Sequence, residues 1–160
     1  MSAPAFPRSL GLAARLGVGA VLVYAGSIKA AGPSEEFALI ISAYQILPQD
    51  MSLTLATFLP YVEMLIGWSL ILGLHLRAAA AAAGAIFAGF LLSIASLGLR
   101  SIELPNCGCF GDSIHLTAAQ AFLVDACLAS LGLVAWKSVP APWSLDHWIK
   151  ASHPVSHGKR

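Results

Sequence analysis

Charged side chains are scarce in this chain of 160 residues: Asp, Glu, Lys and Arg make up 11%, against roughly 25% in an ordinary soluble domain. A soluble domain of this size needs a charged surface, because its surface-to-volume ratio is high. The net charge of +1 also excludes a nucleic-acid binder that relies on a basic patch, so we expect no nucleic-acid partner. Apolar residues make up 58%, which excludes a disordered chain. The composition predicts a membrane protein with the lipid bilayer as its first partner.

Four apolar stretches are long enough to cross a bilayer, whose core of about 30 Å needs roughly 20 helical residues. They cover residues 10–29, 53–74, 78–99 and 116–136. None shows the alternation of a β-barrel, and helices satisfy their own backbone polar groups in lipid. We therefore predict an all-α fold, a four-transmembrane-helix bundle over residues 1–136, with a cytoplasmic polar tail over residues 137–160.

The distribution of Lys and Arg predicts the direction of the spans. With four spans, both termini share one side, and that side holds seven of the nine basic residues. The other two, Lys29 and Arg100, lie at the opposite side. Because the basic side of a membrane protein faces the cytoplasm, we expect both termini in the cytoplasm. The loops over residues 31–52 and 100–115 then face outward.

Both outer loops contain signals for helix starts. Ser34, followed by two Glu residues and an apolar run, predicts a capped, short amphipathic helix that lies at the outer interface. Thr117 and Gln120 match a capping box at the start of the fourth span. The fold prediction therefore includes an outer-face helix in the first loop.

Two of the three cysteines enclose one residue in the second outer loop, as Cys107-Gly108-Cys109. On the oxidising side of the membrane such a pair can form a disulfide, and Gly108 helps the backbone to close the small ring. A strained, exposed disulfide is more oxidising than a structural one, so the motif favours thiol–disulfide exchange. A plain stabilising disulfide and a copper or zinc site with His115 and Asp112 stay as alternatives. We assign no metal ligands.

Ionisable residues inside the spans form the second group of candidates. Glu63 and Asp125 would each cost about 2.5–3.5 kcal/mol in hydrocarbon, so we expect them to face the bundle interior. Lys29 is the candidate partner of Glu63, and a proton path to the outer face is one hypothesis. Alternatively, both acids are packing elements bonded to hydroxyl groups of Tyr24, Ser27 or Ser93. Cys127 is interpreted as a buried, small apolar residue of the fourth span.

Four sequence elements together match a known family. They are Gly26-Ser27-Ile28-Lys29, Tyr44-Gln45-Ile46-Leu47-Pro48, Pro60 with Glu63 and Gly67, and Cys107-Gly108-Cys109-Phe110-Gly111. Through them, residues 12–135 resemble the MauE family of membrane proteins, within the wider DoxX-like group. The resemblance implies that Cys107 and Cys109 are the redox pair, supported by Gly108 and Phe110. It also marks Lys29 and Glu63 as the polar elements of the bundle.

The same resemblance implies partners. It implies a protein of the bacterial inner membrane that works beside a periplasmic thioredoxin-like protein. The two would act in the maturation of an exported, disulfide-rich client such as the small subunit of methylamine dehydrogenase. The bundle is also similar in architecture to quinone-linked disulfide generators, but those use a CxxC pair and a second cysteine pair. We therefore assign no cofactor and leave quinone open. A membrane scaffold that docks a redox partner and a copper- or zinc-handling protein are the alternative functions to a thiol–disulfide oxidoreductase.

Overall fold

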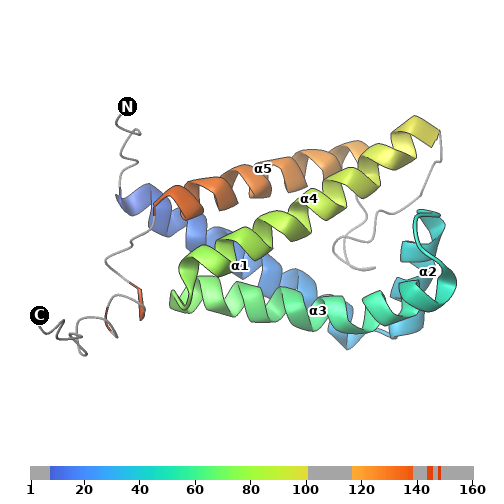
Figure 1. The fold of residues 1–160 in the computed structure, drawn as a ribbon, viewed down its shortest axis with the longest axis horizontal. Coiled ribbons are helices and arrows are strands. Elements are labelled where there is room, and N and C mark those ends of the chain that lie inside the picture. Colours follow the sequence, from blue (N-terminus) through green and yellow to red (C-terminus); the bar gives the residue numbers. More distant parts are fainter. Residues whose placement is uncertain (1–7, 101–116, 139–143, 146–147, 149–160) are drawn as a thin grey trace, which may run out of the picture.

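The computed structural model describes residues 8–100, 117–138, 144–145 and 148, and it contains five helices there (Figure 1). They are α1 (Arg8–Ala31), α2 (Ser34–Ala43), α3 (Gln49–Leu72), α4 (Leu76–Arg100) and α5 (Ala118–Lys137). The described residues form no strand. The four longer helices, α1, α3, α4 and α5, are long and apolar enough to cross a membrane. The predicted all-α, four-helix membrane bundle is confirmed, and the chain is a multi-pass membrane protein.

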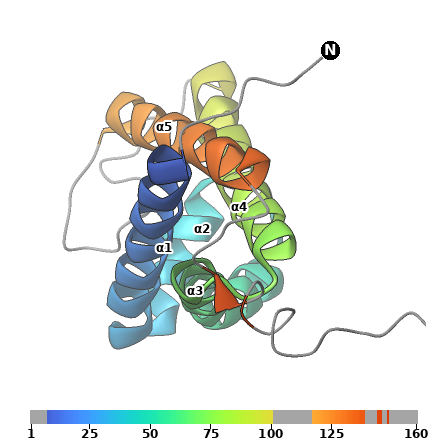
Figure 2. The same cartoon turned by 90° about the vertical axis from the view of Figure 1, so that its left-hand side faces the viewer.

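The four long helices form a ring when the bundle is viewed along its length (Figure 2). In this ring α1 packs between α3 and α5, and α4 packs against the same two helices from the other side. The short helix α2 packs mainly on α3 and lies at one end of the bundle (Figure 1). We call this end the α2 end; it also holds the end of α4 and the start of α5. The start of α1 and the end of α5 lie at the opposite end.

The turn between α3 and α4 reverses the chain at the end opposite α2. Gly73 ends α3 in the left-handed conformation, with φ of 75°, and its N–H donates to the Ser69 carbonyl at 2.9 Å. A Cβ at this position would lie 2.7 Å from Ser144 Cβ and 3.0 Å from Arg15 Nη1. Gly73 is therefore required both by the backbone conformation and by the side chains packed on it. The tight reversal makes α3 and α4 antiparallel neighbours.

Both predicted helix starts are present, but only one uses the predicted cap. At α5, Thr117 Oγ1 accepts from the Gln120 N–H at 3.4 Å, and Thr117 N–H donates to Gln120 Oε1 at 3.1 Å. The capping box is thus confirmed. At α2, Pro33 occupies the cap position and forms no side-chain cap bond, so the prediction of Ser34 as the cap is wrong. Pro33 is held extended there, which makes Ser34 the first helical residue.

Candidate functional site

A buried ion pair joins α1 to α3. The Lys29 ammonium donates to both carboxylate oxygens of Glu63, at 3.0 Å to Oε1 and 2.8 Å to Oε2. Only 1% of either side chain is exposed. The prediction that Lys29 is the partner of Glu63 is therefore confirmed. These two bonds use two of the three N–H donors of the ammonium. A charged group inside a membrane bundle requires such a partner.

Two phenylalanines complete the surroundings of the ammonium. Lys29 Nζ lies 5.7 Å from the ring centre of Phe37 on α2 and 5.6 Å from that of Phe90 on α4. Each distance is within the range of a cation–π contact, in which the ring face attracts a positive charge. Residues from α1, α2, α3 and α4 thus converge on one ammonium group. The pair therefore ties the short helix α2 to three of the spans.

Asp125 of α5 faces the same part of the bundle interior. Its side chain is buried, and together with Lys29, Glu63, Phe87 and Phe90 it borders a residual space of about 10 Å³. A single water molecule requires roughly that volume, so the cluster has little room for solvent. Ionisable side chains from three spans therefore meet in a nearly dry interior.

The hydroxyl groups that were expected to satisfy the intramembrane acids bond elsewhere. Ser27 Oγ donates to the Val23 carbonyl at 2.6 Å, and Ser93 Oγ donates to the Gly89 carbonyl at 2.9 Å. Tyr24 is exposed on the outside of the bundle. The alternative based on these hydroxyls is therefore wrong for Ser27 and Ser93. A serine inside a helix bonds readily to the carbonyl one turn before it, and both do so here.

Small residues bring α1 and α3 close together beside the ion pair. A Cβ on Gly26 would lie 2.6 Å from the Pro60 carbonyl oxygen and 3.2 Å from Glu63 Cβ. A Cβ on Gly67 would lie 2.7 Å from the Gly19 carbonyl oxygen. Both contacts involve backbone atoms, which cannot move aside as a flexible side chain can. The absence of side chains at Gly26 and Gly67 is therefore what sets the helix spacing at the pair.

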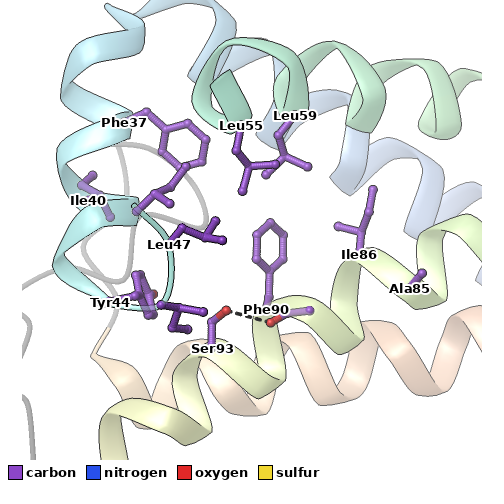
Figure 3. Close-up of a pocket in the computed structure, with 13 residues that line it drawn as sticks. Phe37, Ile40, Tyr44, Leu47, Leu55, Leu59, Ala85, Ile86, Phe90 and Ser93 are labelled. Carbon is purple, nitrogen blue, oxygen red and sulfur yellow. Dashed lines mark hydrogen bonds between the residues drawn. The ribbon is translucent and has the colours of Figure 1, made fainter. Parts of the chain in front are cut away.

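A larger cavity lies on the far side of the two phenylalanines, between α2, α3 and α4 (Figure 3). Its volume is about 250 Å³ and its lining is almost entirely apolar. Figure 3 shows Phe37 on α2, Leu55 and Leu59 on α3 and Phe90 on α4 around it. Since Phe37 and Phe90 both line this cavity and both contact the Lys29 ammonium with their rings, they separate the cavity from the ammonium.

The segment after α2 contributes to the cavity wall at the α2 end. Gln45 has a positive φ of 54°, and its N–H donates to the Ser42 carbonyl at 2.9 Å. Its own carbonyl accepts from Arg100 Nη1 at 3.1 Å. The next two residues, Ile46 and Leu47, line the cavity. Arg100 therefore fastens the segment after α2 to the end of α4.

The predicted redox residues lie outside the described part of the chain. These are Cys107, Gly108, Cys109 and Phe110, and the same holds for Asp112 and His115 of the metal alternative. The described residues on either side of segment 101–116 are Arg100 of α4 and Thr117 before α5, and both of these lie at the α2 end. Cys127 is described, and it is exposed on α5. The expectation that Cys127 is buried is wrong, because α5 turns this position away from the ring of helices.

Three of the four sequence elements that carry the family resemblance meet around these two spaces. Gly26 and Lys29 contact the element of Pro60 and Glu63. Tyr44, Ile46 and Leu47 of another element line the cavity next to them. A comparison with protein families matches residues 7–138 to the family described as Methylamine utilisation protein MauE. The chain belongs to the MauE family. No curated protein and no solved structure gives a significant match.

In this MauE-family chain, the contacts of two aromatic residues with the Lys29 ammonium could not be predicted from the sequence. Phe37 and Phe90 are ordinary apolar residues of an amphipathic helix and of a span, and no spacing in the sequence distinguishes them. Arg100 was counted only as a charge at a helix end. The contacts of all three depend on how α2 folds back over α3 and α4. Such a packing arrangement has no local sequence signal.

Proposed function

We propose that this MauE-family protein is a membrane thiol–disulfide exchange component that acts through Cys107 and Cys109. The family match supports a membrane protein of methylamine utilisation, and the Cys107-Gly108-Cys109 motif carries the redox part of the proposal. A cysteine pair with one residue between its members closes no long loop, so it adds little stability as a structural cross-link. Exchange with another thiol is the chemistry that such a pair supports best.

The exchange step is balanced between two proteins. A thiolate of a partner dithiol attacks one sulfur of the Cys107–Cys109 disulfide, and the other cysteine leaves as a thiolate. The second partner thiol then attacks the mixed disulfide and releases the first cysteine. The partner loses two electrons and two protons and gains a disulfide, while Cys107 and Cys109 become thiols. No further oxidant takes part in this step.

The described residues support the proposal by fixing the two helix ends from which the motif extends. Arg100 is bonded to Gln45, which anchors the end of α4 to the segment after α2. Thr117 and Gln120 form the capping box that starts α5. Since α2 is in turn held by the Lys29–Phe37 contact, the α2 end of the bundle is a connected unit. In this proposal it acts as the platform that presents the cysteine pair.

We further propose the partners and location that the family suggests. The α2 end faces the periplasm of a bacterial inner membrane, where a thioredoxin-like protein exchanges disulfides with Cys107 and Cys109. The client is an exported, disulfide-rich protein, such as the small subunit of methylamine dehydrogenase. Glu63 and Lys29 support the site by holding the bundle together.

A trapping experiment tests the exchange. Cys107→Ser and Cys109→Ser are each expressed in cells with an intact periplasm, and alkylated extracts are separated without reductant. At least one single variant should accumulate a covalent adduct that disappears on reduction, because the cysteine that resolves the mixed disulfide is missing. Mass spectrometry then identifies the partner and its thioredoxin-like fold.

Cys127→Ser provides the matched control, since this exposed cysteine of α5 lies outside the motif. It should form no adduct and should support client maturation normally. The double variant Cys107→Ser/Cys109→Ser should abolish maturation. Normal maturation in the double variant, together with no adduct in either single variant, would establish the scaffold function instead.

A further inference from the structure

The 250 Å³ cavity opens to the outside of the bundle at membrane depth. Ala85 and Gly89 of α4 line it and are both exposed, as is Leu55 of α3. At Gly89 a Cβ would meet nothing within 4 Å, so the missing side chain leaves the entrance open. Both helices are candidate membrane spans, so the entrance faces hydrocarbon. Apolar cavities of this size exclude water and bind apolar groups.

The cationic side chain of Arg100 on α4 lies at the α2 end of this cavity. Ile86 and Ser93 line the cavity and are seven residues apart, and Arg100 follows at the same interval. Because seven residues make close to two helical turns, the three side chains share one face of α4. The Arg100 contact with Gln45 places it next to Ile46 and Leu47 of the cavity wall as well.

The depth of Arg100 matches the headgroup region of a bilayer. Helix α4 has 25 residues, which at about 1.5 Å per residue exceeds a hydrocarbon core of about 30 Å. Its last residue therefore reaches the polar region while Gly89 remains in the core. The guanidinium has five N–H donors, and the structure gives it one bond, to Gln45, among the described residues. Its other donors suit the paired oxygens of a phosphate.

We propose that the cavity binds one acyl chain of a membrane phospholipid whose phosphate is held by Arg100. The positive charge of Arg100 complements the phosphate, and the apolar cavity next to it holds the acyl chain. The entrance between Leu55 of α3 and Ala85 and Gly89 of α4 lets the chain enter sideways from the bilayer. The lipid fills the space between α2, α3 and α4, against the phenylalanines that cover Lys29. The lipid site consists of described residues, and its occupancy is independent of the proposed chemistry at Cys107 and Cys109.

Photolabelling tests the site on the full-length protein in lipid nanodiscs. The probe is a phosphatidylethanolamine with a diazirine in one acyl chain, added as a small fraction of the lipid. Label on Phe90 in the cavity is compared with label on Leu123, which is exposed on α5 and reports contact with bulk lipid. We expect enrichment at Phe90 by about tenfold, equivalent to about 1.4 kcal/mol of preferential binding. Equal labelling of both positions would overturn the proposal.

Gly89→Phe blocks the entrance, and Gly98→Phe is its matched control. Both glycines lie on α4 with open space at the Cβ position, but only Gly89 lines the cavity. Gly89→Phe should remove the enrichment at Phe90, while Gly98→Phe should keep it. Circular dichroism of both variants verifies that the helices form. Enrichment that survives in folded Gly89→Phe would contradict entry between α3 and α4.

Charge variants test the phosphate contact. Arg100→Gln keeps a donor for the Gln45 carbonyl but loses the charge, whereas Arg100→Lys keeps the charge. We expect the enrichment to fall several-fold in Arg100→Gln and to persist in Arg100→Lys. A farnesyl chain with the same diazirine and no phosphate is the comparison probe. The proposal is refuted if this probe labels Phe90 as strongly as the phospholipid does and if Arg100→Gln changes the labelling by neither probe. The cavity would then bind any hydrocarbon chain.

Discussion

The Lys29–Glu63 pair shows how a costly residue can hold a membrane bundle together. Each charge alone would be unfavourable in hydrocarbon, yet the two meet at 2.8 Å and the rings of Phe37 and Phe90 cover the ammonium. Once both are present, removing one partner leaves the other buried without compensation. The pair therefore favours the one arrangement of α1 and α3 in which both charges are satisfied.

Single and double substitutions measure this coupling. Lys29→Met and Glu63→Gln should each lower the free energy of unfolding by about 3–5 kcal/mol, because a buried pair is broken. The double variant should lose less than the sum of the two, since it leaves no isolated charge. Chemical unfolding in mild detergent, followed by circular dichroism, gives the three values. Additive losses would show that the two residues are not coupled.

At Cys107 and Cys109 the prediction concerns redox potential. A disulfide ring closed by one intervening residue would depart from the relaxed geometry of a disulfide, and its reduction would release that strain. We expect a midpoint potential above about −300 mV, below which structural disulfides typically lie. Titration against glutathione and dithiothreitol buffers, read by the gel shift of alkylated protein, measures it. A midpoint well below that value, or thiols that never pair, would exclude an oxidant.

The sequence predicted the residues of the ion pair but not what surrounds them. Lys29 and Glu63 could be paired because each is a rare charge in an apolar span and the spans are consecutive. The contacts of Phe37 and Phe90 with the ammonium have no such signal, because phenylalanine is common in spans. Likewise, the hydroxyl donors were misassigned because Ser27 and Ser93 bond to their own helices.

Among the helices, the contact of α1 with α3 explains why glycine occupies positions 26 and 67 of these two spans. Without a hydrophobic driving force in lipid, helices associate through close packing, which small residues permit. Gly26 lies against the backbone of Pro60, and Gly67 lies against that of Gly19. This spacing is also what brings Lys29 within reach of Glu63. The helix contact and the ion pair therefore depend on each other.

Alanine substitutions test the contact between α1 and α3. Gly26→Ala and Gly67→Ala should each destabilise the protein by about 1–3 kcal/mol, because the new methyl group meets a fixed carbonyl oxygen. Gly17→Ala in α1 is the control, since nothing lies within 4 Å of its Cβ position. Thermal unfolding of the three variants is compared in the same detergent. Equal stability of all three would mean that the helices can separate at no cost.

Helix starts were predictable where the signal is local. Thr117 and Gln120 form the expected capping box because both bonds depend only on residues three apart. The start of α2 was misplaced by one residue, since Pro33 takes the cap position before Ser34. The position of α2 over α3, and hence the cavity beneath it, depends on contacts between distant residues. Only the structure shows these.

For the whole molecule, the charge distribution bears on the direction of insertion. The α2 end contains Lys29 and Arg100, but Lys29 is neutralised inside the bundle by Glu63. Arg100 is then the one exposed basic side chain at this end among the described residues. Four described basic residues lie at the opposite end of the bundle, namely Arg8, Arg15, Arg77 and Lys137. The described Lys and Arg residues are therefore divided four against two between the two ends, in the direction that the whole sequence predicts.

We predict that the α2 end faces the periplasm, because basic residues are retained on the cytoplasmic side during insertion. In intact cells treated with reductant, a membrane-impermeant maleimide should modify Cys107 and Cys109. Cys127 should stay unmodified, since its exposed position on α5 faces lipid. An epitope tag placed after Arg160 should resist external protease until the cells are opened. If Cys107 and Cys109 are protected from the maleimide and the tag is digested, the orientation is the opposite one. The cysteine pair would then lie outside the oxidising compartment.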